Sequence, residues 1–417
     1  MGMAMTQVQL SITALGAGGD GIAHDADGQP VFVPLSVTGD VVLAEVDAER
    51  RGKITEIIEA SPNRTAPPCR HFGICGGCAL QHVKDDAYRA FKVDAVTQVL
   101  QRNGITLPET VETVFIPART RRRANFAARV VKGRVIIGFH ERKSANVRDV
   151  PDCLLITEDV RHIMEGIRPY LRDIAGAGGR MDVLVQCADG QAEVGLTGKI
   201  APGWEAQQAL SDALRTLDLS RISIRARDYE AYEILLEAKG FYKSFGGLRA
   251  KLAPGAFLQP SAEGERALSD IVIRGAGDAR RIADLFCGNG TFTGPLLDGR
   301  EVTAADFAPD AIAALREAGA NAHLRNLFKN PLDPFELEDR DCVILDPPRA
   351  GAQAQVEMLG KTKVPHIVYV SCNPQSFARD AVILRDGGYT LSALTIVDQF
   401  IWSAHTEIIG IFDRSLT

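Results

Sequence analysis

The chain has 417 residues, of which 46% are hydrophobic and 24% charged, and its formal net charge is −6. This length exceeds what one hydrophobic core usually supports, so we expect two or three globular domains. No stretch approaches the roughly 20 apolar residues of a membrane span, which argues against a membrane protein. The first residues, MGMAMTQVQLS, lack the basic and apolar regions of a signal peptide, so we expect a cytoplasmic protein.

Residues 7–58 alternate apolar and polar side chains in short runs such as VQLSI, PVFVPL and DVVLAEV, separated by glycine-rich and acidic turns. This pattern predicts a small β-barrel of about five strands. Gly16, Gly18 and Gly21 match the G-x-G-x-x-G pattern of phosphate loops. We reject that function, because the residues that follow are typical of strand and turn and offer no helix N-terminus to hold a phosphate.

A proline-rich segment, residues 60–69, marks a domain boundary and ends at the first of three clustered cysteines. The chain has eight cysteines, and in a cytoplasmic protein they argue against a disulfide framework and for metal binding or catalysis. Cys69, Cys75 and Cys78 lie in CRHFGICGGC, whose glycines suit a loop that wraps a metal, and Cys153 offers a distant fourth ligand. Four thiolates suit either zinc or an iron–sulfur cluster.

Residues 85–102 predict a helix that is capped by Asp85 and ends at the Asn103-Gly104 pair. Beyond it, strands and helices mix without a repeat up to about residue 255. We therefore expect a central α/β domain there.

Within the central part, residues 118–150 hold ten Lys or Arg against two acidic residues, a local excess of ten minus two, or +8. The net charge of the whole chain argues against a nucleic-acid partner, and a run of charges is usually only a solvated surface. Against this, Arg121 to Arg123 beside Asn125 and Phe126 offer phosphate contacts and a stacking group for unpaired RNA. We expect an RNA-binding surface here.

The last 160 or so residues alternate apolar strand, turn and helix, as in a parallel sheet with crossover helices. In RRIADLFCGNGTFTGPLL, a strand leads into a turn where Gly288 and Gly290 let a ligand approach the backbone closely. Asp306 ends the next strand, sixteen residues after Gly290, and is well placed to bind ribose hydroxyls. This spacing is compatible with NAD as well as with S-adenosylmethionine.

Two details favour S-adenosylmethionine. The turn lacks the third glycine of a dinucleotide-binding motif, and Asp284 directly before it is placed to meet the positively charged methionine end. Further strand ends supply Asn326 in HLRN and Asp346 in DCVILD. The pattern therefore predicts a methyltransferase rather than a dehydrogenase.

The run VYVSCNPQSF places Cys372 at the end of a β-branched and aromatic segment. A cysteine there is often a small buried hydrophobe, but strand ends of open α/β sheets are also where catalytic groups collect. In DPPR, Arg349 occupies the place where methyltransferases of exocyclic amines carry an aromatic residue, so amine methylation is disfavoured. Methylation at a pyrimidine carbon explains the thiol, because a thiolate added to C6 of uracil makes C5 nucleophilic.

After methyl transfer, a base must remove the C5 proton so that the thiolate can leave. The segment DQFIWSAHTEIIGIF, residues 398–412, offers His405 and Glu407 at the start of the terminal apolar strand. We predict Glu407 as the base, with His405 as a weaker rival.

Together, DLFCGNGTF, DPPRAGA, VSCNP and the late H-x-E resemble the RNA uridine-5-methyltransferase family. With the barrel and the cysteine cluster, the chain is most similar to the branch that modifies 23S ribosomal RNA, and the resemblance spans almost the whole chain. It implies that Cys372 is the nucleophile, that Glu407 accepts the proton, and that the four cysteines carry a [4Fe-4S] cluster with a structural or RNA-positioning role. It also implies six contacts to S-adenosylmethionine: Gln259, Phe286, Thr291, Asp306, Asn326 and Asp346.

The chain departs from the family pattern at three places. Thr291 stands where the family often has Asn, Pro260-Ser261 replaces the usual x-Asn after the Gln, and DQFIWSAHTE lacks the usual Met-Phe-Pro. The first departure weakens one expected cofactor contact, and the other two alter the expected geometry of the substrate and the base.

The expected fold class is α/β, and the resemblance assigns four segments. They are a TRAM-like, OB-like β-barrel over residues 1–60, an iron–sulfur loop and linking helix over 61–105, a central α/β RNA-binding domain over 106–250, and a Rossmann-like methyltransferase domain over 251–417. The expected function is S-adenosylmethionine-dependent methylation of uridine C5 in RNA, with 23S rRNA as the preferred substrate. We expect no membrane and no obligate protein partner.

Three other functions remain open. A tRNA uridine-5-methyltransferase would share the same chemistry. An RNA cytosine-5-methyltransferase would also use a thiol, but it normally needs a second cysteine in the motif that reads DPPR here. A non-catalytic RNA-binding protein would not need Cys372, Asp346 and Glu407, which are all present.

Overall fold

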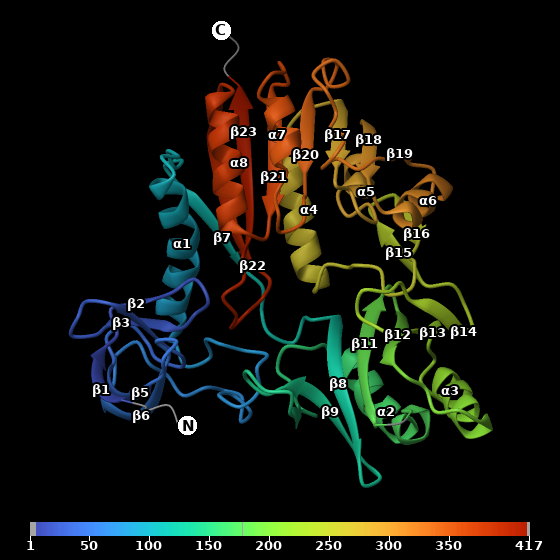
Figure 1. Ribbon diagram of the computed structural model, residues 1–417. Helices are drawn as coiled ribbons and strands as arrows, with labels where there is room; N and C mark the ends of the chain where they lie inside the picture. The colour runs from blue at the N-terminus through green and yellow to red at the C-terminus, as the bar shows by residue number, and fades with distance from the viewer. Residues whose placement is uncertain (1–5, 177, 415–417) are drawn as a thin grey trace. The chain divides into compact units, whose positions relative to one another are not determined.

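The computed structural model describes residues 6–176 and 178–414 (Figure 1). The described residues fall into two compact units. The first contains residues 6–95, 139–148 and 400–405, and the second contains residues 96–138, 149–176, 178–399 and 406–414. The expected absence of a signal peptide rests partly on residues 1–5, which lie outside the described residues.

Six short strands make up the N-terminal part of the first unit, in two antiparallel sheets. One sheet has the order β1 (Thr6–Ser11), β5 (Val41–Val46), β6 (Gly52–Glu59), and the other has the order β2 (Ala14–Leu15), β3 (Gly21–His24), β4 (Pro30–Val33). Alternate residues of both sheets share one core, made of Leu10, Ile12, Ala23, Val31, Val33, Val42 and Ala44. The alternation read from the sequence therefore predicts a barrel-like module correctly, with one strand more than expected. Its glycine motif forms the β2–β3 hairpin turn and precedes no helix.

Helix α1 (Asp85–Arg102) has the predicted bounds. Asp85 is its first residue rather than its cap, and its carboxylate bonds to Arg89 at 2.7 Å. The acidic first turn and the basic last turn both complement the helix dipole.

The second unit contains most of a sheet whose strands run in the order β10, β9, β8, β11, β12, β13, β14; the residues of β9 and β10 between 139 and 148 belong to the first unit. Their bounds are β8 (Arg123–Val131), β9 (Arg134–His140), β10 (Val147–Asp149), β11 (Arg180–Ala188), β12 (Gln191–Gly198), β13 (Arg221–Arg225) and β14 (Glu233–Glu237). Helices α2 (Glu158–Ile174) and α3 (Trp204–Thr216) pack against each other and against this sheet. The hairpin of β15 (Tyr242–Phe245) and β16 (Leu248–Lys251) follows.

The last sheet has eight strands in the order β19, β18, β17, β20, β21, β23, β22, β7. Their bounds are β17 (Arg281–Leu285), β18 (Glu301–Asp306), β19 (Asn321–Leu324), β20 (Cys342–Leu345), β21 (His366–Ser371), β22 (Tyr389–Asp398), β23 (Glu407–Arg414) and β7 (Val111–Phe115). All neighbouring pairs are parallel except those that β23 makes, which are antiparallel. The expected α/β, Rossmann-like fold is thus confirmed.

Strand β7 corrects one expectation. Residues 111–115 lie in the segment assigned by sequence to the central domain, yet they pair in parallel with β22 and extend the last sheet. The segment is short and half-exposed, so its sequence carries no signal that distinguishes the two sheets.

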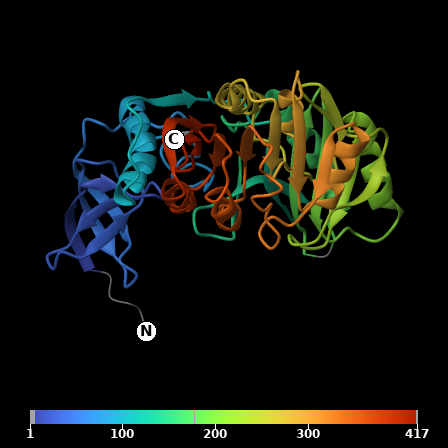
Figure 2. The ribbon, with the colours of Figure 1, turned by 90° about the horizontal axis from the view of Figure 1, so that it is seen from above.

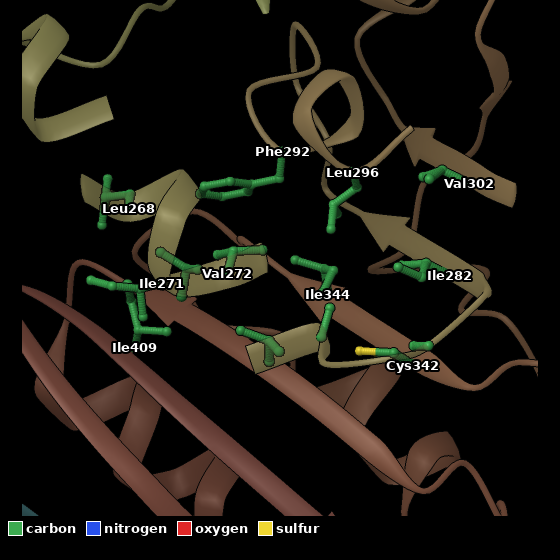
Figure 3. Close-up of a cluster of buried hydrophobic side chains, with 14 of the residues drawn as sticks. Leu268, Ile271, Val272, Ile282, Phe292, Leu296, Val302, Cys342, Ile344 and Ile409 are labelled. Atoms are coloured by element: carbon green, nitrogen blue, oxygen red, sulfur yellow. The ribbon is translucent and has the colours of Figure 1, made fainter. Parts of the chain in front are cut away.

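Helices cover both faces of the eight-stranded sheet (Figure 2). They are α4 (Ala262–Ala276), α5 (Thr293–Leu296), α6 (Pro309–Glu317), α7 (Gln353–Leu359) and α8 (Pro374–Asp386). Figure 3 shows the core beneath α4, where Leu268, Ile271 and Val272 point toward strand residues such as Ile344 and Ile409. This core fixes the strands whose ends carry the site described below.

None of the described helices is both long enough and apolar enough to span a membrane.

Candidate active site

The candidate active site lies along one edge of the eight-stranded sheet. Strands β17, β18, β20 and β21 are parallel, so their carboxyl ends meet there, at Phe286, Asp306, Asp346 and Cys372. Strand β23 is antiparallel and begins at the same edge with Glu407. Ligands of open α/β sheets bind at this edge.

Cys372 lies between the end of β21 and the start of α8, and it is half-buried. Burial raises the pKa of the Cys372 thiol to about 11, and the negative charges of Glu407 and Asp346 contribute, whereas Arg349 opposes them. The thiol is therefore protonated at neutral pH, and added positive charge nearby would favour the nucleophilic thiolate.

The loop that carries Arg349 is held by helix α8. Asn373 caps that helix and donates its side-chain amide to the Arg349 carbonyl at 2.9 Å. The buried Asp380 carboxylate accepts hydrogen bonds from the Ala352 backbone at 2.7 Å and from the Tyr369 hydroxyl at 2.5 Å. These contacts hold the loop of the DPPR motif, which contains Arg349, beside the strand end that bears the thiol.

Glu407 is the first residue of β23, and its side chain is buried. Burial raises its pKa to about 7, while a hydrogen bond from Gln399 opposes the shift. A carboxylate that titrates near neutral pH is suited to general base catalysis. The rival His405 is exposed, and its ring meets Phe400 edge-on at 6.1 Å.

Three further carboxylates surround the same edge. Burial raises the pKa of Asp284 to about 7, with Asp306 adding to the shift. Burial also raises the pKa of Asp346 well above its usual value, with contributions from Glu407, Asp284 and Asp306. A cationic ligand at this edge would favour the ionised forms of these carboxyl groups, because an opposite charge lowers a carboxyl pKa.

The expected cofactor residues do not all converge. Gln259 is joined to Glu407 through Gln399, which donates to Gln259 Oε1 at 2.8 Å and to Glu407 Oε1 at 3.3 Å. Thr291, by contrast, lines a separate cavity of about 940 Å³ together with Lys243 and Glu265. Sequence reasoning missed Gln399, although its place directly after β22, the partner of the strand bearing Glu407, was an available signal.

Comparisons with known proteins agree with this geometry. Residues 322–414 match the family model described as tRNA (Uracil-5-)-methyltransferase. A Caulobacter vibrioides protein named uncharacterized RNA methyltransferase is 38% identical over 423 residues, covering 97% of this chain and 99% of that protein. The 23S rRNA (uracil(1939)-C(5))-methyltransferase of Xylella fastidiosa is 31% identical over 457 residues, covering 98% of each.

The chain belongs to the RNA uracil-5-methyltransferase family. It is therefore an S-adenosylmethionine-dependent methyltransferase that acts on uracil C5 in RNA. A solved structure, the Pyrococcus abyssi tRNA (uracil-54, C5)-methyltransferase in complex with S-adenosyl-L-homocysteine, shares the fold with a TM-score of 0.76 and 22% identity, covering 97% of this chain and 99% of that one.

The residues of this methyltransferase fit S-adenosylmethionine at the glycine turn after β17. Phe286, Gly288 and Gly290 all have positive φ, and the Gly288 amide donates to the Asp306 carboxylate at 3.0 Å. The buried Asp284 accepts from the Thr293 hydroxyl through Oδ2, but its Oδ1 has no hydrogen-bond partner among the described residues. A buried carboxylate oxygen without a partner is a natural place for a cationic or N–H donor group of a ligand.

Two aromatic rings flank this turn. The Phe286 ring packs 5.3 Å from that of Phe328, which is 40% exposed. Asn326, an expected cofactor contact, is exposed, and its side-chain oxygen accepts from the Phe328 and Lys329 amides. Asn326 therefore shapes the loop that presents Phe328, a ring that sequence analysis did not select.

The cysteine loop of the methyltransferase fits a metal only partly. Cys69, Cys75 and Cys78 are half-buried, and burial raises the pKa of Cys75, with the charge of Cys69 contributing. Cys153 is buried in the second unit. Nevertheless, no group of three or more His, Cys, Asp or Glu side chains in the described part of the chain is close enough to hold a metal.

The expected RNA-binding side chains need one correction. Phe126 is fully buried in β8, so its ring is not available to stack on RNA. Arg122 is also buried and pairs with Glu265 at 2.5 Å. Phe126 points into the interior because alternate residues of β8 face opposite sides. Arg122 precedes β8, and its guanidinium group turns to Glu265 of α4. The sequence reading placed the whole basic run on one surface.

The other three cysteines are not candidate nucleophiles. Cys187, Cys287 and Cys342 are buried, and burial raises the pKa of each. Buried apolar surroundings make a thiol inert.

Proposed function

We propose that this methyltransferase modifies a uridine of 23S rRNA, with Cys372 as the nucleophile and Glu407 as the base that removes the C5 proton. One observation carries the proposal: a half-buried thiol and a buried carboxylate share one sheet edge, near enough for the charge on Glu407 to raise the pKa of Cys372. The rRNA substrate is supported by the name of the Xylella fastidiosa relative.

When bound, S-adenosylmethionine supplies an electrophilic methyl group on a positively charged sulfur. The Cys372 thiol gives up its proton to water and adds as the thiolate to C6 of uracil. The electron pair of the C5–C6 double bond moves toward the C4 carbonyl, which makes C5 nucleophilic. After C5 has taken the methyl group, the Glu407 carboxylate accepts the C5 proton. The C5–C6 double bond then re-forms, the sulfur–C6 bond breaks, and its electron pair returns to Cys372.

The six expected cofactor contacts remain part of the proposal. Asp306 would bind ribose hydroxyls, because both of its oxygens are already held in place by the Gly288 and Ala308 amides. A cationic sulfur would favour the ionised forms of Asp346 and its neighbours, because an opposite charge lowers a carboxyl pKa, and the resulting attraction would hold the sulfur there. Thr291 is the weakest of the six, since it lines the separate cavity beside Lys243.

The test uses 23S rRNA fragments and tRNA transcripts that contain 5-fluorouridine, because fluorine at C5 does not leave as a proton does. With S-adenosylmethionine present, we expect a denaturation-resistant adduct on the rRNA fragment, and none with Cys372→Ala. Glu407→Gln should still form this adduct but lose turnover on ordinary uridine by at least about 100-fold. The matched control His405→Ala should retain turnover.

The outcomes separate the alternatives. An adduct on tRNA alone would replace the rRNA substrate by tRNA, the substrate of the Pyrococcus abyssi structural neighbour. Turnover by Cys372→Ala would overturn the covalent mechanism, and loss of turnover in His405→Ala with activity retained in Glu407→Gln would reassign the base.

We also propose that RNA lies over a cleft of about 360 Å³ that Arg123, Asn125, Arg225 and Tyr232 help to line. Arg123 donates to Gln186 through Nε, and its two terminal nitrogens have no hydrogen-bond partner among the described residues. Its guanidinium lies 5.7 Å from the ring of Phe257, which is 61% exposed. Free guanidinium donors beside an exposed ring suit a phosphate and an unstacked base.

The cleft is tested by the salt dependence of RNA binding. Arg123→Ala should weaken binding and reduce the slope of log K against log salt by about 1, because one phosphate contact is lost. Arg215→Ala, which removes an exposed arginine of α3, is the control and should leave the slope unchanged. Equal slopes for both variants would contradict the proposal.

We propose further that the N-terminal strands form a TRAM-like RNA-binding module and that the enzyme acts in the cytoplasm. The barrel-like pairing of β1 to β6 around one core supports the module. Phe32, an aromatic residue of β4 that is 40% exposed, offers a base-stacking group. Phe32→Ala should weaken binding of the rRNA fragment without changing turnover at saturating RNA.

A [4Fe-4S] cluster on Cys69, Cys75 and Cys78, with Cys153 as the fourth ligand, is also proposed. The family resemblance and the proximity of the Cys69 and Cys75 thiols support it, and no catalytic step uses it. Anaerobically purified protein should contain about four iron and four sulfide per chain. Each of the four Cys→Ser variants should lose them, whereas Cys187→Ala should not. Zinc in place of iron would contradict the cluster.

A further inference from the structure

Gln399 occupies a central place in the site. It follows directly after β22, it is buried, and its side-chain nitrogen lies between Gln259 and Glu407. The nitrogen donates to Gln259 Oε1 at 2.8 Å and to Glu407 Oε1 at 3.3 Å. One amide group thus joins two site residues that are far apart in sequence.

Chemistry sets the direction of these hydrogen bonds. An ionised carboxylate only accepts, so the Gln399 nitrogen, and not its oxygen, must face Glu407. Because the same nitrogen also faces Gln259, that residue must present its oxygen to Gln399. The Gln259 nitrogen is then turned away from Gln399, and it is left to donate elsewhere.

The fold fixes two members of this hydrogen-bonded chain, Gln259 and Gln399. The backbone carbonyl of Gln259 accepts from Arg122 Nε at 3.1 Å, and Arg122 pairs with Glu265 of α4. On the other side, a Cβ added at Gly264 of α4 would lie only 2.5 Å from Gln399 Oε1. The first turn of α4 therefore leaves just the room that the Gln399 amide occupies.

We propose that Gln399 is a positioning residue for removal of the C5 proton, because it holds the Glu407 carboxylate and the Gln259 amide in one hydrogen-bonded chain. This inference rests on the proposed function of Cys372 and Glu407. It assigns Gln399 to the second half of the reaction, after the methyl group has been transferred, and gives it no part in the attack by Cys372.

The surroundings of Glu407 predict how loss of the Gln399 donor would change the pKa of Glu407. Asp346 and Cys372 are the titratable groups whose pKa values respond to the charge of Glu407, and Arg349 acts on Cys372 in the opposite sense. Gln399 is the group that lowers the pKa of Glu407 against its burial. Removing the Gln399 donor would raise that pKa, so ionised Glu407 would become abundant only at higher pH.

The test separates the two halves of the reaction in the full-length enzyme. Gln399→Met removes the donor at similar volume, and Gln399→Glu keeps the shape while replacing the donor by a carboxyl group. Both should form the 5-fluorouridine adduct at a rate within about threefold of the unaltered enzyme, because that adduct needs no proton removal. On ordinary uridine, turnover should fall about 10- to 100-fold and the methylated protein–RNA adduct should accumulate.

The pH profile supplies the second readout. The acid limb of kcat should move to higher pH by about one unit in Gln399→Met, and further in Gln399→Glu. Gln355→Met is the matched control, because Gln355 is also buried and, among the described residues, its side chain bonds only to the Leu332 backbone. It should leave both the adduct rate and the pH profile unchanged.

Each outcome bears on one claim only. Turnover and pH profile unchanged in both Gln399 variants would overturn the role of Gln399, as would equal slowing of adduct formation and turnover. Absence of the 5-fluorouridine adduct in the unaltered enzyme, or its presence in Cys372→Ala, would instead overturn the proposed function.

Discussion

At Cys372, three charged side chains act on one thiol. Burial, Glu407 and Asp346 raise the pKa of Cys372, and Arg349 is the cation that lowers it. Arg349 thus has a chemical role in this site that differs from the base-stacking role of an aromatic residue at the same place in amine methyltransferases. Its backbone carbonyl accepts from the side-chain amide of Asn373, the cap of α8, which places the start of the Arg349 side chain near the strand end that carries the thiol.

We predict that Arg349→Gln slows alkylation of Cys372 by iodoacetamide at pH 8 about three- to tenfold, which corresponds to a rise of about half to one unit in its pKa. The rate is measured by mass spectrometry on the peptide that contains Cys372, because other half-buried thiols also react. Arg385→Gln, which removes an exposed arginine of α8 paired with Asp386, is the control. Equal rates in the two variants would show that Arg349 does not act on the thiol.

At the scale of the elements, the turn after β17 shows why a glycine is needed. Gly290 has φ of +92°, a conformation that residues with a Cβ rarely adopt, and a Cβ there would lie 2.6 Å from Leu315 Cδ2 of α6. The turn and α6 therefore approach each other as closely as the backbone allows, which shapes the cofactor side of the sheet edge.

Gly290→Ala should destabilise the protein by about 1–3 kcal/mol, because it adds both backbone strain and a steric overlap. It should also weaken binding of S-adenosylmethionine, measured by calorimetry. Gly247→Ala, in the turn of the β15–β16 hairpin, is the control: no atom lies within 4 Å of the added Cβ, so stability should change by less than about 0.5 kcal/mol. Unaltered cofactor binding in a folded Gly290→Ala protein would contradict this account of the turn.

At the scale of the whole molecule, the carboxylates at the sheet edge link stability to pH. The pKa of Asp284 rises from 3.8 to about 7 and that of Glu407 from 4.5 to about 7 on folding. The folded state therefore binds protons more tightly than the unfolded state at these two groups. Their contribution to stability is greatest below pH 4 and is lost as pH rises toward 7.

We predict that Asp284→Asn flattens this part of the stability profile. Between pH 5 and pH 8, the melting temperature of the variant should fall less steeply than that of the unaltered protein, because the buried carboxyl that must ionise is gone. Asp278→Asn, at an exposed position, is the control and should keep the original slope. Parallel profiles for all three proteins, measured by scanning calorimetry, would contradict the predicted linkage.

The sequence alone predicted the order of the elements of the last sheet and the strand ends that carry the candidate site residues. Apolar runs followed by turn residues predicted the strands that end at Asp306, Asp346 and Cys372. Parallel strands align their carboxyl ends, so these residues could be placed at one edge without coordinates. The bounds of α1 and the start of β23 at Glu407 were also readable, because both depend on local patterns of caps, glycine and apolar residues.

The tertiary structure decided the rest. It placed β7 in the last sheet, buried Arg122 and Phe126, and brought Gln399 against Gln259, 140 residues earlier in the chain. Local patterns report the conformation of a segment and which of its faces is apolar. They do not report which distant segment will pack against that face, because this depends on strand pairing and side-chain packing across the whole unit.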